Sequence, residues 1–150
     1  MSEPQDRIRS AYSRVPYPGV ADPKSHIRCL EALGTLFGIQ PANITDCRVL
    51  ELGCASGTNL IPQAFECPQS QFVGVDFSAD RIAEGQSVID ELSLDNTRLE
   101  HANITDVDAS WGQFDYILCP GVFSWVAPEV QDKLLAICRE NLAPRGVAVV

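Results

Sequence analysis

The chain has 150 residues, of which 45% are hydrophobic and 21% are charged, the balance of a folded domain rather than a disordered chain. Asp and Glu number 20 against 11 Lys and Arg, so the formal net charge is −9. Because surfaces that bind nucleic acid usually carry a basic excess, this charge argues against a nucleic-acid partner.

No segment approaches the roughly 20 apolar residues of a membrane-spanning helix, and the polar N-terminus lacks the apolar core of a signal peptide. The six cysteines are scattered without a C-x-x-C pair, which argues against a metal site or a disulfide framework. We therefore expect reduced thiols, a cytoplasmic location, and neither a metal nor a membrane in the function. The sequence does not indicate an oligomeric state.

Residues 1–24 contain four prolines and two tyrosines, Tyr12 and Tyr17. This proline density disfavours a continuous helix and predicts an ordered arm. Ser25 is the expected N-cap of a following helix, which stops at Gly38. The apolar residues that recur at helical spacing behind this cap are Ile27, Leu30, Leu33 and Phe37.

Short apolar runs alternate with helical patterns over the rest of the chain, which predicts a parallel sheet with helices on both faces, a doubly wound α/β fold. We assign residues 1–40 to the arm and its helix and residues 41–150 to this core. Strands are expected at 48–52, 71–76, 97–103, 114–119 and 147–150, with a turn at 141–146. Helices are expected at about 58–66, at about 78–93 and from Pro128 onward.

Parallel sheets of this kind bind ligands beyond the carboxyl ends of their strands. Functional residues are therefore expected just after positions 52, 76, 103 and 119. Because the chain ends within its fifth strand, we also expect this core to be an incomplete part of a longer protein.

The first of these turns is E-L-G-C-A-S-G-T-N at 51–59. Its two glycines allow a ligand close to the backbone, and the next helix points its N-terminal amides at this turn. A dinucleotide fingerprint would need glycine at Ala55 and Thr58, and the residues from Thr58 on do not match a Walker A loop. What remains is a small-residue loop preceded by a carboxylate, Glu51, or alternatively a tight turn without a ligand.

The second and third turns add two polar residues. Asp76 follows Gly57 by 19 residues, where an acidic side chain can accept hydrogen bonds from both hydroxyls of a ribose; the alternative is a helix cap. Asn103 ends the third strand and could meet the edge of a base, with Ile104 on its face. The alternative for Asn103 is an Asx turn.

In this order and spacing, the motifs V-L-E-L-G-C-A-S-G-T-N, F-V-G-V-D-F-S, H-A-N-I-T-D and F-D-Y-I-L-C resemble those of class I S-adenosylmethionine-dependent methyltransferases, from about residue 48 to 150. The segments G-C-A-S-G-T-N-L-I-P and G-V-F-S-W-V-A-P, with the Tyr- and Pro-rich arm and Ser25-His26, resemble bacterial protein-lysine methyltransferases with a C-terminal methyltransferase regulatory domain. The resemblance implies a Rossmann-like fold and S-adenosylmethionine as the cofactor.

The resemblance also assigns residues. The loop residues would surround the methionine part of the cofactor, Asp76 would hold the ribose, and Phe77 would pack on the adenine, whose edge Asn103 and Ile104 would bind. The cofactor-binding residues that we expect are Glu51, Gly53, Cys54, Ala55, Gly57, Asn59, Asp76, Phe77, Asn103, Ile104 and Cys119. Two of them depart from the usual pattern, because many members have glycine at the position of Ala55 and aspartate at that of Asn103.

On the substrate side, Phe123 and Trp125 could form an aromatic wall around a lysine side chain, or they could simply be core residues. Tyr12, Tyr17 and His26 are further candidates in or beside the arm. We assign no catalytic base, and none of these patterns requires Cys119 as a nucleophile, since methyl transfer from a sulfonium needs no covalent intermediate.

Three functions stay open from the sequence. The chain could belong to a protein-lysine methyltransferase that transfers the methyl by direct displacement, or to a small-molecule methyltransferase with the same core motifs. It could also be an S-adenosylmethionine-binding module without catalysis. The expected partner is accordingly a protein or a small-molecule methyl acceptor.

Overall fold

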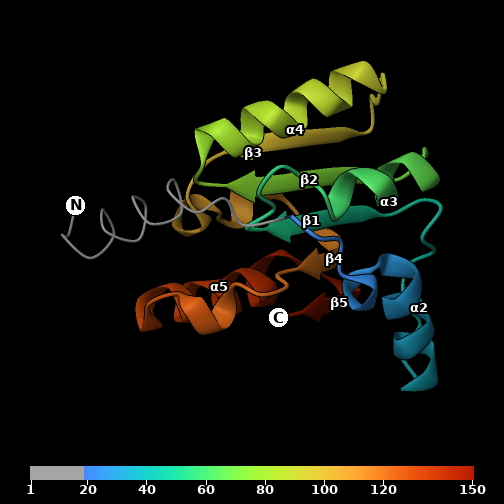
Figure 1. Cartoon of the computed structure of the whole chain (residues 1–150). Helices are drawn as coiled ribbons and strands as arrows, with labels where there is room; N and C mark the ends of the chain where they lie inside the picture. The colour runs from blue at the N-terminus through green and yellow to red at the C-terminus, as the bar shows by residue number, and fades with distance from the viewer. Residues whose placement is uncertain (1–18) are drawn as a thin grey trace.

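The computed structural model describes residues 19–150, which fold around one sheet of five parallel strands (Figure 1). The sheet order is β3-β2-β1-β4-β5, so successive strands are added on one side of β1 up to β3 and on its other side from β4 onward. This doubly wound arrangement confirms the predicted fold class. The strands are β1 (Arg48–Leu52), β2 (Gln71–Asp76), β3 (Thr97–His101), β4 (Phe114–Leu118) and β5 (Leu142–Val149).

Helices cover both faces of the sheet because alternate side chains of each strand point to opposite sides. On one face, α2 (Ile27–Leu36), α3 (Leu60–Glu66) and α4 (Ala79–Glu91) pack against Val49, Phe72 and neighbouring residues. On the other, α5 (Pro128–Asn141) packs against Leu50, Val73 and their neighbours. Short 3-10 turns follow β3 and β4 at the carboxyl edge: η2 (Ile104–Asp106) after β3 and η4 (Phe123–Trp125) after β4. A third turn, η3 (Ala109–Trp111), precedes β4.

The predicted strands at 48–52 and 71–76 are confirmed residue for residue, whereas three strand boundaries are corrected. β3 ends at His101, two residues early, and β4 ends at Leu118. The expected turn at 141–146 is wrong, because Asn141 ends α5 and β5 begins at Leu142. Pairing with β4 is irregular between Phe114 and Tyr116, which accommodates the Pro and Gly of this segment without ending the strand.

The α2 predictions are correct only in part. Ser25 belongs to the 3-10 turn η1 (Pro23–Ser25), and His26 is the N-cap of α2, since its Nδ1 accepts a hydrogen bond from the Arg28 amide. Of the four apolar residues at helical spacing, Ile27 and Leu30 are buried, whereas Leu33 is 43% exposed and Phe37 is 79% exposed. The predicted helix at 58–66 begins two residues later, at Leu60. Among the described helices, none is long and apolar enough to span a membrane.

Candidate functional site

The loop between β1 and α3 lies at the carboxyl edge of the sheet and is attached to β2. The backbone amides of Gly53 and Cys54 both donate to the carbonyl of Val75, at 2.8 and 3.0 Å. Gly53 and Gly57 have φ values of +77° and +70°, a left-handed conformation that favours glycine. Ala55 between them has φ +49°, so alanine adopts the same conformation in place of the usual glycine.

Asp76 connects this loop to the end of β2. Its Oδ2 accepts from the Ala55 amide at 2.9 Å, and its Oδ1 accepts from the Ser78 amide at 2.8 Å. The side chain is 7% exposed. The N-cap of α4 is Ser78 and not Asp76, so the helix-cap alternative is wrong. Each carboxylate oxygen of Asp76 has a second lone pair available to another donor.

Glu51 is the most buried carboxylate of the predicted set, at 2% exposure. Its Oε1 accepts from Asn59 Nδ2 at 3.0 Å, whereas its Oε2 is buried without a hydrogen-bond partner. Burial raises the pKa of Glu51 to about 8; the Asn59 hydrogen bond opposes this shift, and the negative charge of Asp76 adds to it. A buried acceptor of this kind requires a donor, and a cation suits it best.

Asn59 lies at the start of α3 and is held from two sides. Its Nδ2 donates to Ser25 Oγ at 3.1 Å as well as to Glu51, and its Oδ1 accepts from the Asp22 amide at 3.1 Å. The sequence predicted Asn59 as a cofactor ligand; its side chain here holds Glu51. The sequence marks Ser25 as a helix cap and as part of the family resemblance, but no sequence pattern connects it to a residue 34 positions away.

Gly53 is also closely packed from the β4–α5 side. A Cβ at this position would lie 2.6 Å from Val122 Cγ2, so only glycine allows this approach. Val122 directly precedes η4, which carries the two aromatic candidates. The loop that would bind the cofactor and the loop expected on the substrate side are therefore in contact, a relationship that no sequence motif indicated.

The predicted adenine-side residues surround the ends of β2 and β3. Asn103 is exposed and caps η2, where its Oδ1 accepts from the Thr105 amide at 3.1 Å. This is the local turn that was considered as an alternative to ligand binding. Ile104 is half-buried against the α5-side core, and Phe77 is half-buried after β2, with its carbonyl 3.1 Å from His101 Nε2.

The two cysteines of the predicted set are core residues. Cys54 is 3% exposed, and its Sγ donates to the Ala55 carbonyl at 3.6 Å. Cys119 is fully buried on the α5 side, and its amide donates to Val149 at 2.9 Å. Burial raises the pKa of the Cys119 thiol to about 12 and raises that of Cys54 as well. Neither thiol is activated as a nucleophile.

The substrate-side candidates that the structure describes do not form one cluster. Phe123 is half-buried against the core, whereas Trp125 is 74% exposed. His26 Nε2 lies 3.8 Å from Glu66 at the C-terminal end of α3, whereas the Glu51–Asn59 contact lies at the N-terminal end. Burial lowers the pKa of His26. Tyr12 and Tyr17 lie outside the described residues.

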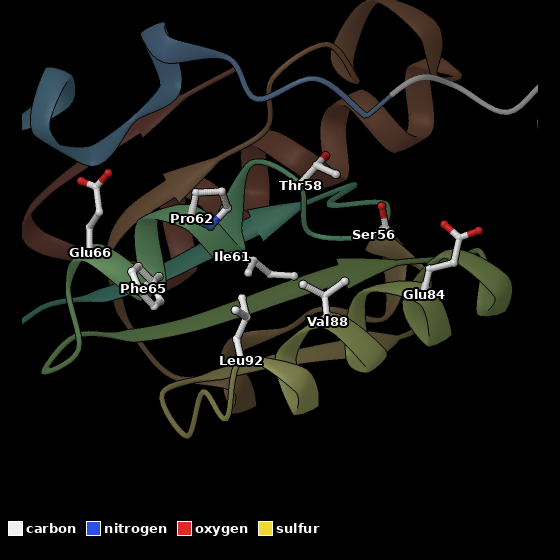
Figure 2. A pocket seen from close by; sticks show the side chains of 9 residues that line it. All are labelled: Ser56, Thr58, Ile61, Pro62, Phe65, Glu66, Glu84, Val88 and Leu92. Atoms are coloured by element: carbon white, nitrogen blue, oxygen red, sulfur yellow. The ribbon is translucent and has the colours of Figure 1, made fainter.

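A separate apolar groove of about 610 Å³ lies between α3 and α4 (Figure 2). Figure 2 shows Ile61, Val88 and Leu92 directed toward the space between the two helices. The groove shares Ser56 and Thr58 with the β1–α3 loop, but its lining includes neither Glu51 nor Asp76. It is therefore distinct from the predicted cofactor-binding residues.

The residues at the carboxyl edge fit the chemistry of S-adenosylmethionine. The unpartnered Oε2 of Glu51 can accept from the cofactor's ammonium group, and the free lone pairs of Asp76 can accept from ribose hydroxyls. The left-handed loop with Gly53 and Gly57 leaves its backbone open to close approach. The side chains present at these positions therefore offer acceptors for the ammonium group and the ribose hydroxyls of the cofactor.

The chain also matches known proteins. Residues 50–148 match the family model described as "Methyltransferase domain". RP789, an uncharacterized protein of Rickettsia prowazekii, is 43% identical over 93% of this chain. The trans-aconitate 2-methyltransferase of Deinococcus radiodurans is 30% identical over 69% of this chain. The chain spans about a quarter of the length of RP789 and about a third of that of the Deinococcus protein, at 25% and 36%.

Among solved structures, the PKMT2 protein of Rickettsia typhi in complex with AdoHcy superposes with a TM-score of 0.85 at 41% identity, over 89% of this chain and 26% of that one. AdoHcy is the demethylated product of S-adenosylmethionine. The family match covers well over half of the chain, and the strand order and carboxyl-edge loop agree with it. The chain therefore belongs to the methyltransferase domain family, whose cofactor is S-adenosylmethionine.

Proposed function

We propose that this chain is the cofactor-binding part of an enzyme that transfers a methyl group from S-adenosylmethionine to a lysine amine of a protein. The observation that carries the cofactor site is the Glu51 carboxylate, buried at 2% exposure with its Oε2 unpartnered. The lysine acceptor is supported by the 41% identity with PKMT2 and by the G-V-F-S-W-V-A-P segment.

S-Adenosylmethionine supplies an electrophilic methyl with a good leaving group, so this chain's task is mainly alignment. Glu51 and Asp76 would fix the two ends of the cofactor at the carboxyl edge. The loop that follows β4 is in contact with Gly53 through Val122, which supports a place for Phe123 and Trp125 on the acceptor side. Exposed Trp125 offers an aromatic face to a lysine side chain.

A lysine amine must lose its proton before it can attack the methyl. An apolar, desolvated setting lowers the pKa of lysine and would assist this step. The remaining candidates for this side of the site, Tyr12 and Tyr17 in the arm, keep their predicted role. Six free thiols support the predicted cytoplasmic location. The similarity to enzymes with a C-terminal regulatory domain stays a prediction, which the gene sequence downstream of Val150 would test.

A small-molecule acceptor is the second candidate, and the 30% identity with trans-aconitate 2-methyltransferase favours it. Transfer from S-adenosylmethionine labelled in its methyl group separates the two. The intact protein is incubated with a cell extract, which is then divided into protein and small-metabolite fractions. Label on lysine residues of the protein fraction supports the proposal, whereas label confined to small metabolites overturns it in favour of the second candidate.

A further inference from the structure

A short N-terminal strap, which we define as residues 22–27, crosses the start of α3 beside Glu51. The Asp22 amide donates to Asn59 Oδ1 at 3.1 Å, and the Ile27 amide donates to Gln63 Oε1 at 3.0 Å. Ser25 is 1% exposed and lies between these two contacts. The strap is therefore attached to α3 by two side chains of that helix.

Ser25 and Asp22 determine which way the Asn59 amide faces. Because the Asp22 N–H requires an acceptor, Oδ1 of Asn59 faces the strap at 3.1 Å. The hydroxyl of Ser25 donates to the Asp22 carbonyl at 2.9 Å and accepts from Asn59 Nδ2 at 3.1 Å. The second hydrogen of Nδ2 is then left for Glu51 Oε1, at 3.0 Å. All polar atoms of this amide have partners.

We propose that Ser25 is a positioning residue of the cofactor site, which acts through Asn59 to hold the Glu51 carboxylate in place for the ammonium group of S-adenosylmethionine. This inference rests on the proposed cofactor site. Glu51 Oε2 has no partner of its own, so its direction depends on the hydrogen bond at Oε1. Loss of the Ser25 hydroxyl leaves a buried N–H of Asn59 unpaired and loosens that bond.

The charge on Glu51 provides a readout that separates positioning from stability. The ionisable groups that interact electrostatically with Glu51 are Asp76 at the end of β2 and the thiols of Cys54 and Cys119. The Asn59 hydrogen bond lowers the pKa of Glu51 against the effect of burial. A loosened bond therefore raises that pKa, and binding of a cationic ligand group must then begin at a higher pH.

The test is calorimetric titration of the full chain with S-adenosylhomocysteine between pH 6 and 9, for wild type, Ser25→Ala and Ser25→Thr. We expect Ser25→Ala to weaken binding roughly fivefold at pH 7 and to shift the midpoint of the pH profile upward. Ser25→Thr keeps the hydroxyl and should restore both values.

Ser70→Ala is the matched control. Ser70 is as buried as Ser25, and its hydroxyl donates to the Ile44 carbonyl at 2.7 Å. This hydroxyl also accepts from the amide of Cys47, the residue before β1, so it lies at the opposite edge of the sheet from Glu51. This variant should lose stability without a shift of the midpoint. A Ser25→Ala midpoint equal to that of wild type, or one matched by Ser70→Ala, overturns the inference while leaving the cofactor site intact. Absence of binding by folded wild-type chain overturns both.

Discussion

The Asp76 carboxylate accepts a hydrogen bond from the backbone amide of Ala55 at 2.9 Å. This contact joins the end of β2 to the β1–α3 loop at Ala55, whose φ of +49° is uncommon for a residue other than glycine. The same carboxylate therefore holds the loop and keeps lone pairs that a ligand could use. If Asp76 binds the cofactor as proposed, loop conformation and ligand recognition are coupled at this point.

Ala55→Gly tests whether this loop conformation is strained. The left-handed region costs a non-glycine residue roughly 1–2 kcal/mol, and glycine loses about 0.5–1 kcal/mol to its larger unfolded-state entropy. We expect the variant to be more stable by about 0.5 kcal/mol in urea denaturation. Ala83→Gly, at an exposed position of α4, is the control and should be less stable by about 1 kcal/mol. Destabilisation of both variants by the same amount would contradict a strained Ala55.

Gly85→Ala tests how closely α4 packs on the loop. Alanine normally stabilises a helix interior relative to glycine. Here a Cβ would clash with Leu99 Cδ1 and would lie 2.6 Å from the Ser56 carbonyl oxygen, which belongs to the loop backbone. We expect a loss of about 1–3 kcal/mol of unfolding free energy and weaker binding of S-adenosylhomocysteine.

The control for this variant is Ser87→Ala, two residues further along α4 and exposed. It should be neutral or slightly stabilising in the same urea titration. An unchanged or increased stability of Gly85→Ala would contradict this close packing, because the loop backbone at Ser56 would then have room for the added methyl group.

Glu51→Gln tests the burial of the carboxyl through the pH dependence of stability. The pKa of Glu51 is about 8 in the folded chain and 4.5 at its usual value. Between these values the folded chain binds more protons than the unfolded one, so the contribution of Glu51 lowers stability as pH rises from about 4.5 to 8. Glutamine cannot ionise, so the variant should lose this decline.

The measurement for Glu51→Gln is urea denaturation without ligand at pH 5, 6.5 and 8. Glu91→Gln, an exposed carboxyl at the end of α4, is the control and should keep the wild-type profile. An equal pH dependence in wild type and Glu51→Gln would mean that Glu51 is ionised in the folded chain at neutral pH.

The sequence predicted the central strands well for a physical reason. β1 is a short apolar run followed by Gly53, and β2 is a short apolar run that ends at Asp76. Such runs are typical of parallel strands that are buried on both faces. The start of β5 could not be predicted in the same way. Pro144 and Gly146 are typical of turns. In the structure they lie between Leu142 and Val147, which pair with Phe114 and Tyr116 of β4 across a shift of register.

The site was predictable where it follows strand ends, and not where it depends on distant contacts. Glu51 and Asp76 were identified from their positions, which the sheet brings to one edge. The bond between Ser25 and Asn59 joins residues 34 positions apart, and the contact of Val122 with Gly53 depends on how two loops approach. Leu33 and Phe37 follow the same helical spacing as buried Ile27 and Leu30 but are exposed, and periodicity does not show whether another element covers that face.

The most direct test of the cofactor site is calorimetric titration of the full chain with S-adenosylhomocysteine, with Asp76→Ala alongside wild type. Circular dichroism and urea denaturation establish that both chains are folded, because this substitution also removes the acceptor of the Ala55 amide. We predict saturable binding by wild type with one site per chain and at least tenfold weaker binding by folded Asp76→Ala. Equal affinity of the two folded chains would contradict the assignment of the carboxyl edge as the cofactor site.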